Sequence, residues 1–321
     1  MSRPPAVLLN VAAPWDGPDP VDVAVRAGSA GLDGVGLVDS PRLFRDGLVE
    51  TARVLGATPA RLAGPCVTSL GLRHPATVAG ALRTLEEHAP GRVLGVVGRG
   101  ESSVRNEGLP LPSLAEYTAA LDGVRTALGD SPLAGSGRLL GAASGPRTLA
   151  VTARALGGVL VDAGVDPAVV TRAVAAARAE DPATAVWLFL RAALTSTEEA
   201  AVAAAEPTLG SCALRLASAP GWYGLADAEL DAVRAVAETH DYSRHGHADA
   251  RGGRQGGADR SVRERFFLTG SPDDVAARLR PLAGLGVAGV VLAGAVPGVE
   301  ARLPELAGVL RAGLTEPGGD G

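Results

Sequence analysis

The sequence predicts an α/β protein with one (β/α)8 barrel, the TIM-barrel class, as a single domain over residues 1–321. The chain has 321 residues, and one barrel needs about 250 residues plus insertions. Eight short apolar runs alternate with amphipathic stretches, a pattern typical of parallel strands covered by helices. The G-x-G-x-x-G turn of a dinucleotide-binding open sheet does not follow the first run.

In the first half of the chain, four β-like runs alternate with three helical segments. The run AVLLNVAA opens the series as a continuous apolar stretch. The strands are expected at Ala6–Ala13, Gly34–Asp39, Leu62–Ser69 and Val93–Val97. Apolar residues recur at helical spacing in the segments between them, which are Val21–Gly31, Leu48–Leu55 and Pro75–His88.

The second half continues the alternation, with clear signals for two helix starts. Ser113 is a predicted N-cap with Glu116 at N3, and Thr269-Gly270-Ser271-Pro272 precedes another helix. The strands are expected at Leu139–Ala143, Gly158–Val161, Val186–Leu194 and Val287–Ala293. The helices are expected at Leu114–Leu128, Pro146–Leu156, Pro167–Ala179, Glu198–Thr239 and Asp273–Leu282.

Two polar segments interrupt this order. Ser243–Ser261 is rich in Gly and charged residues, and we expect a mobile segment or lid there. The tail Glu316–Gly321 is expected to fray.

Composition excludes several classes of function. A net charge of −5 and a pI near 5.6 argue against a nucleic-acid partner. Cys66 and Cys212 are too few for a disulfide framework or a Cys zinc site. No apolar run is long enough for a membrane span, and the N-terminus lacks a signal-peptide core, so a cytoplasmic location is expected. The chain contains no Lys, so an anion must be held by Arg, hydroxyls or backbone N–H groups.

Small and polar residues gather where the predicted strands end, and this is the functional face of a (β/α)8 barrel. Small residues let a flat ring or a phosphate approach the backbone. Ser144-Gly145-Pro146 also opens a helix, whose N-terminus is an anion site. Each loop alone is more typical of ordinary turn and capping chemistry, whereas several at one face favour a phosphorylated cofactor.

Five segments, in this order and spacing, resemble the luciferase-like family of flavin- or F420-dependent oxidoreductases. Within that family the chain is most similar to the methylenetetrahydromethanopterin reductase branch. The segments are Gly31–Asp39, Arg73-His74-Pro75 with the following Gly91–Gly95, Gly98–Ser103, Ala142–Leu149 and Leu268–Val275.

The resemblance implies a two-electron hydride carrier in the barrel mouth, F420 in one branch and FMN in another. It places Asp39 near the ring, and it places a bulge with a non-prolyl cis peptide at Cys66-Val67 behind the ring. The phosphate loop is matched by Ser144 and Gly145. The implied cofactor-binding residues are Asp39, Cys66, Val67, Thr68, Ser69, Gly98, Arg99, Gly100, Ala143, Ser144 and Gly145.

Glu101 is the acid–base candidate at this face, with Ser40 as a hydrogen-bonding relay. Some relatives carry His where Ser40 stands, Asn at Ser69 and Asp at Glu101, so these assignments rest on the residues present here. A solvent-facing loop charge is the alternative for Glu101. His240, His245 and His247 lie in a loosely spaced, Gly-rich context, and no metal site is predicted.

The leading functional hypothesis is an F420H2-dependent reductase that transfers hydride to an unsaturated organic substrate, such as a natural-product or peptide intermediate. The Lys-free composition fits an actinobacterial source. The alternatives are an FMN-dependent luciferase-like monooxygenase and a non-catalytic barrel that serves as a partner subunit. The expected partners are a small-molecule or peptide substrate, with a homodimer left open.

Overall fold

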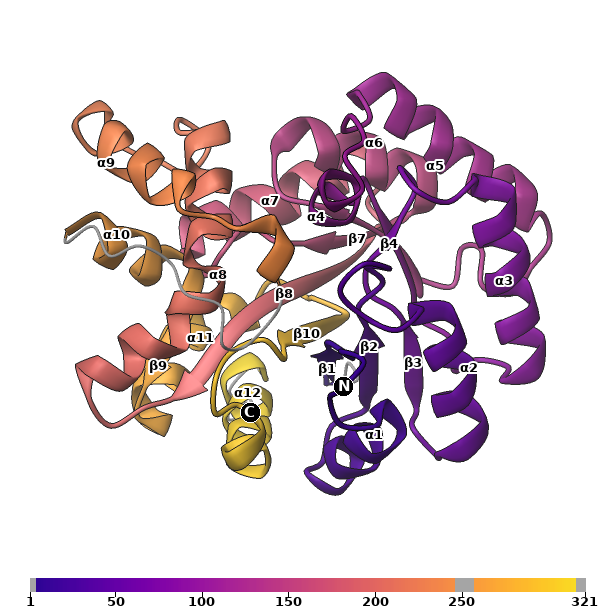
Figure 1. Ribbon diagram of the computed structural model, residues 1–321, viewed down its shortest axis with the longest axis horizontal. Coiled ribbons are helices and arrows are strands. Elements are labelled where there is room, and N and C mark those ends of the chain that lie inside the picture. The colour runs from indigo at the N-terminus through magenta and orange to yellow at the C-terminus, as the bar shows by residue number, and fades with distance from the viewer. Residues whose placement is uncertain (1–3, 246–256, 316–321) are drawn as a thin grey trace, which may run out of the picture.

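The computed structural model of the protein describes residues 4–245 and 257–315. Its strands form one parallel sheet, and the helices surround that sheet as a ring (Figure 1). The sheet order is β3-β2-β1-β10-β8-β7-β6-β5-β4, with β9 paired to β8. The strands are β1 (Ala6–Val11), β2 (Gly34–Leu37), β3 (Leu62–Pro65), β4 (Thr68–Ser69), β5 (Gly95–Gly98), β6 (Leu139–Ala143), β7 (Gly158–Val161), β8 (Ala185–Leu194), β9 (Phe267–Gly270) and β10 (Gly289–Ala293).

The two ends of this sheet meet in one stretch of chain. β3 pairs with β2, and β4, which follows it, pairs with β5. A parallel bridge joins Ala63 to Val93, where the Ala63 N–H donates to the Arg92 carbonyl at 2.9 Å. The sheet therefore curves into a barrel, and the predicted eightfold alternation of strand and helix is confirmed, with β3 and β4 sharing one position.

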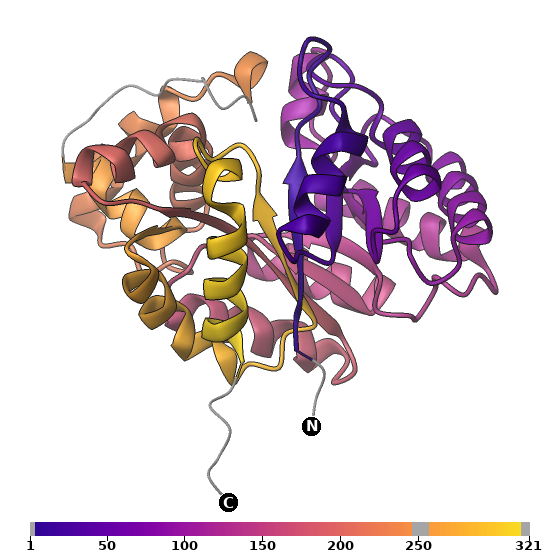
Figure 2. The same cartoon turned by 90° about the horizontal axis from the view of Figure 1, so that it is seen from below.

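The helices lie outside the barrel, as the turned view also shows (Figure 2). Side chains cap several of them, and the predicted capping box of Ser113 and Glu116 is present. The helices are α1 (Pro20–Ser29), α2 (Gly47–Ala57), α3 (Pro75–His88), α4 (Glu101–Asn106), α5 (Leu114–Leu128), α6 (Pro146–Leu156), α7 (Pro167–Glu180), α8 (Glu198–Ser218), α9 (Asp227–Glu238), α10 (Gly257–Phe266), α11 (Pro272–Ala283) and α12 (Leu303–Leu314), with 3-10 turns η1 (Tyr242–Arg244) and η2 (Glu300–Arg302).

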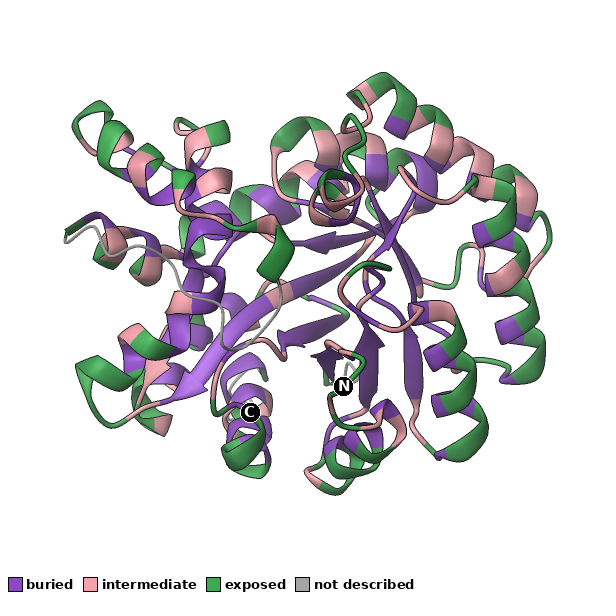
Figure 3. Cartoon of the chain, in the orientation of Figure 1, coloured by how far each residue is buried: buried purple, intermediate pink, exposed green. Residues whose placement is uncertain are grey.

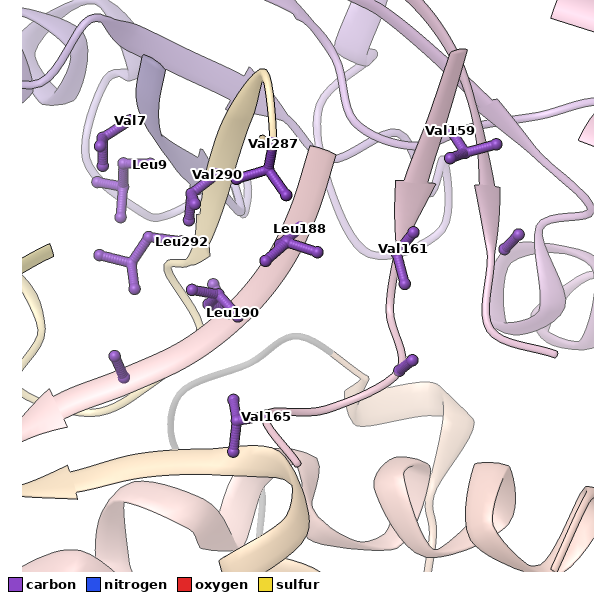
Figure 4. Packing of buried hydrophobic residues seen from close by; sticks show 14 of the residues in the cluster. Val7, Leu9, Val159, Val161, Val165, Leu188, Leu190, Val287, Val290 and Leu292 are labelled. Carbon is purple, nitrogen blue, oxygen red and sulfur yellow. The ribbon is translucent and has the colours of Figure 1, made fainter. Parts of the chain in front are cut away.

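The strands are buried on both faces (Figure 3), and they divide the core into two layers. One layer lies between the sheet and the helices, and it includes Val7, Leu9, Val159 and Val161 (Figure 4). The other fills the barrel interior: Ala6, Leu8, Leu62, Cys66, Leu94, Val96, Leu140, Leu160, Trp187 and Val291. Because side chains alternate along a strand, this division fixes which residues near each strand end face the mouth.

Several boundaries differ from the sequence prediction. The expected strand Leu62–Ser69 is broken between β3 and β4, because the chain bulges at Cys66 and Val67. The expected helix Glu198–Thr239 is two helices, since Pro220, Gly221 and Gly224 fall between α8 and α9. The strand β9 was not predicted. It extends the sheet beyond the barrel along residues 191–194 of β8.

The expected mobile segment Ser243–Ser261 is only partly described. Its first residues belong to the turn η1, and its last residues begin α10. Residues 246–256 and the predicted fraying tail lie outside the described residues. Within the described parts of the chain, no helix is long and apolar enough to cross a membrane.

Candidate active site

The interior layer of the core reaches the surface at the C-terminal ends of the strands. Val67, Ala142 and Phe189 pack on this layer but remain partly exposed, and we call these three residues the mouth floor. Gly98 makes room for it, because a Cβ on Gly98 would lie 2.7 Å from Val67 Cγ1. The mouth floor is therefore a partly exposed apolar surface at the end of the barrel interior.

The bulge beside the mouth floor has the predicted backbone. The Cys66–Val67 peptide bond is cis, as the resemblance implies. Cys66 faces the barrel interior, and burial raises the pKa of its thiol to about 12. The thiol is protonated at neutral pH, so Cys66 shapes the bulge and does not act as a nucleophile.

Asp39 follows β2, and its buried carboxylate makes several hydrogen bonds. Its carboxylate accepts hydrogen bonds from Thr68 Oγ1 at 2.5 Å and from Nε and Nη2 of Arg73 at 2.9 Å each. The Gly47 N–H adds a fourth contact at 3.3 Å. Arg73 also pairs with Asp46, the N-cap of α2, at 2.7 Å. These contacts make Asp39 the group that fixes Thr68 and the bulge against α2.

The loop after β5 packs closely on β4. Gly100 has a left-handed φ of 76°, and a Cβ there would lie 1.9 Å from Ser69 Oγ. Ser69 Oγ also accepts from the Gly71 N–H and donates to the Arg99 carbonyl. The Arg99 guanidinium donates to the Pro112 carbonyl, with Nε at 3.0 Å. Arg99 therefore holds the loop before α5, and glycine is required at residue 100.

The predicted phosphate loop lies at the N-terminus of α6. Gly145 is the N-cap and has no side chain to cap the helix, while Thr148 Oγ1 accepts from the Gly145 N–H at 3.3 Å. A Cβ on Gly145 would meet no atom within 4 Å, so the space in front of the residue is open. Tyr223, between α8 and α9, donates to the Ser144 carbonyl at 2.8 Å and fixes the loop, while Ala143 is buried. An open helix N-terminus is a suitable site for a phosphate.

Among the residues that the structure describes, two buried oxygen atoms near the mouth have no hydrogen-bond partner. They are Asn10 Oδ1, at the end of β1, and Ser40 Oγ, after β2. Asn10 is 9% exposed and Ser40 is 4% exposed. An unpaired buried polar atom costs about 1–3 kcal/mol. These atoms and the apolar mouth floor fit a flat ring with polar edges, such as that of a flavin or deazaflavin.

A buried ion-pair cluster faces the mouth from β7 and β8. Asp162 accepts from Arg191 Nη1 at 2.7 Å and Nη2 at 3.0 Å, and it pairs with Arg215 of α8 at 2.8 Å. Burial alone would raise the pKa of Asp162, but the charges of Arg191 and Arg215 outweigh it and lower this pKa to about 2. The guanidinium of Arg191 also lies 5.1 Å from the ring centre of Phe189.

Glu101 opens α4 at the rim and is not in an apolar setting. Its side chain is 52% exposed and lies 3.5 Å from Arg105. Tyr242 Oη donates to its Oε1 at 3.1 Å, and Asn106 donates to the Tyr242 carbonyl at 2.8 Å. These contacts join α4 to the turn η1. Glu101 therefore helps to hold η1 against α4.

The histidines cluster without a metal-binding arrangement in the described residues. His240 packs edge-on against Tyr242 and His245. Burial, with the nearby His240 and Arg215, lowers the pKa of His245 to about 3, so its imidazole is neutral. Across residues 4–245 and 257–315, no group of three His, Cys, Asp or Glu side chains could hold a metal. His247 lies outside the described residues.

Sequence reasoning missed three residues of this mouth: Asn10, Phe189 and Arg191. Arg191 gave a signal, because it is the one charge inside the apolar run from Val186 to Leu194. Asn10 gave a similar signal inside its own apolar run. Neither signal places the residue at the site, because a continuous apolar strand does not reveal which alternate residues face the barrel interior.

The fold and site define a parallel (β/α)8 barrel whose mouth offers an apolar floor, unpaired polar atoms and an open helix N-terminus. A family model described as luciferase-like monooxygenase matches residues 11–289. The chain therefore belongs to the luciferase-like monooxygenase family, whose members are oxidoreductases. No curated protein matches the chain.

Solved structures of low identity share the fold. A coenzyme F420-dependent tetrahydromethanopterin reductase from Methanopyrus kandleri has a TM-score of 0.70 at 17% identity, over 95% of this chain and 97% of that chain. An F420-dependent secondary alcohol dehydrogenase, in complex with an F420–acetone adduct, has 0.65 at 16%, over 97% and 99%. The EDTA monooxygenase from Chelativorans sp. BNC1 has 0.63 at 15%, over 97% and 94%.

Proposed function

We propose that this protein is an F420-dependent oxidoreductase that uses F420H2 to reduce an unsaturated organic substrate. The observation that carries the proposal is the partly exposed mouth floor, Val67, Ala142 and Phe189, beside the unpaired atoms of Asn10 and Ser40. Two of the structural neighbours are F420-dependent enzymes, and this supports F420 over other flat cofactors.

Different groups of the protein would bind the ring and the phosphate of the cofactor. Val67 and Ala142 would lie under one face of the ring, and the N-terminus of α6 at Gly145 would hold the phosphate. Asp39 and Thr68 would keep the bulge in place. When bound, F420H2 supplies a hydride at a ring carbon and reacts poorly with oxygen.

The protein must also deliver a proton to the substrate atom that gains charge. Glu101 is the proposed donor at the rim, where its carboxylic acid would give the proton and its side chain is oriented by Tyr242 and Arg105. Ser40 is the proposed relay, because its buried hydroxyl has no partner among the described residues. Substrates with an electrophilic C=C, C=N or C=O carbon fit this division of roles.

An FMN-dependent monooxygenase is the second candidate. Membership of the luciferase-like monooxygenase family favours it, and so does the similarity of the fold to that of the EDTA monooxygenase. The same mouth floor would accept the isoalloxazine ring, so the two candidates differ in the cofactor and in the use of oxygen.

Titration of the purified protein with F420 and, separately, with FMN tests the proposal, with binding followed by absorbance and fluorescence. We expect F420 to bind more tightly than FMN, and we expect Ala142→Leu to weaken binding at least tenfold by filling the mouth floor. The matched control is Ala76→Leu, at an exposed position of α3. Tighter binding of FMN would favour the monooxygenase, and binding of neither would favour a non-catalytic barrel.

A further inference from the structure

Asn10 is a polar residue near the C-terminal end of β1, whose other residues are apolar. It pairs in register with Gly36 of β2 and with Ala293 of β10. Leu8, two residues earlier, belongs to the interior layer of the core, so Asn10 also faces the barrel interior, one level closer to the mouth. Its side chain lies where the interior layer gives way to the mouth.

The neighbouring strands leave space for this side chain. Gly36 has no side chain, and a Cβ there would lie 2.8 Å from Asn10 Oδ1 and 2.7 Å from Cys66 Cβ. The amide of Asn10 therefore lies across from the bulge at Cys66, inside the ring of strand ends. Glycine at residue 36 keeps both groups in place.

Within residues 4–245 and 257–315, Asn10 Oδ1 is buried and accepts no hydrogen bond. Such an atom destabilises the protein by about 1–3 kcal/mol, whereas a Leu side chain would not. An unpaired buried atom lowers the stability of the protein. Where such an atom faces the barrel mouth, we expect a ligand to supply the missing hydrogen bond.

The chemistry of the mouth limits what that ligand group can be. Asp162 and Arg191, the ionised groups of the buried cluster in the mouth, bind each other through two hydrogen bonds. Asn10 is neutral and offers one carbonyl and one N–H2 group. A neutral ring edge with adjacent C=O and N–H groups matches an amide, whereas a phosphate or a carboxylate does not.

We propose that Asn10 is a ring-binding residue that pairs with the C=O and N–H edge of the pyrimidine ring of the cofactor. This inference rests on the proposed function, and it holds for F420 and FMN alike, since both rings carry that edge. The contact fixes how far the ring enters the mouth and sets its rotation over Val67.

Two variants test the proposal from the protein side. Asn10→Ala and Asn10→Leu should weaken binding of F420, or of FMN if that ring binds more tightly, at least tenfold. The melting temperature of the cofactor-free protein should stay equal or rise, because an unpaired buried acceptor is removed. Thr208→Val is the matched control, since Thr208 Oγ1 is also buried and unpaired but lies in α8. It should leave the cofactor Kd unchanged.

The ligand side gives an independent test that does not depend on folding of a variant. A ring methylated at the N–H between its two carbonyls should bind the native protein at least tenfold more weakly than the parent ring. The same methyl group should cost little in Asn10→Ala, because the partner is already gone. If the native protein binds both rings equally, or if Asn10→Ala keeps the native Kd, the inference is wrong. If the native protein binds neither F420 nor FMN, the proposed function itself fails.

Discussion

Asp162, at the end of β7, and Arg191, in β8, form a two-bond ion pair in the barrel mouth, with distances of 2.7 and 3.0 Å. The Arg191 side chain is 4% exposed, so its charge depends on this partner. Breaking such a pair from one side costs about 3–5 kcal/mol. Asp162→Asn should therefore lower the free energy of unfolding by that amount in urea at pH 7.

Asp122→Asn is the matched control for this change. Asp122 pairs with Arg125 on the surface of α5, where both side chains are about half exposed. An exposed pair contributes about 0–1 kcal/mol, so the control should be nearly neutral. An equal loss of unfolding free energy in the two variants would show that Asp162 does not stabilise the buried charge of Arg191.

The same pair predicts how stability depends on acid. The folded-state pKa of Asp162 is lowered to about 2, against 3.8 for the free group. A lowered carboxyl pKa contributes stability above the unfolded value, and this contribution is lost as the pH falls through the folded value. Asp162 should account for about 2 kcal/mol of the drop in unfolding free energy of the native protein between pH 4 and pH 2. Asp162→Asn should lack this part of the drop.

Gly145→Leu tests the phosphate site at the start of α6. A Cβ at residue 145 meets no protein atom within 4 Å, so the melting temperature should change little. The side chain would project into the space proposed for the phosphate, and the cofactor Kd should rise at least tenfold. Gly221→Leu is the control, because residue 221 is equally open but lies between α8 and α9. Unchanged cofactor binding in Gly145→Leu would place the phosphate elsewhere.

Glu101→Gln tests the proton donor. Gln keeps the shape and can still accept from Tyr242 Oη, but it cannot supply the proton. Turnover should fall by about 10²–10⁴-fold, with cofactor binding nearly unchanged. Glu107→Gln is the control, since Glu107 pairs with Arg42 just after α4. Full turnover in Glu101→Gln would assign the proton to solvent or to another group.

Apolar patterning was sufficient to predict the barrel, because each buried parallel strand is a continuous apolar run. It could not predict the break at Cys66–Val67, since that run stays apolar through the bulge. It also missed the short strand β9, whose four residues directly follow the charged helix α10. Pro220 and Gly221, which follow α8, are the sequence signal for the end of that helix.

The site was less predictable than the fold. Residues of the loops, such as Gly145 and Gly100, could be found because they follow strands in the sequence. Asn10, Phe189 and Arg191 lie within strands, and their role depends on which alternate positions face the interior. Only the register between neighbouring strands, such as Asn10 beside Gly36, shows that direction.

The central claim is that a deazaflavin ring lies on the mouth floor. A crystal structure of the protein with F420 tests this most directly. The account predicts the ring within about 4 Å of Val67 and Ala142, with its pyrimidine edge at Asn10 and the phosphate at Gly145. A ring bound outside the barrel mouth, or bound there with its pyrimidine edge turned away from Asn10, would contradict it.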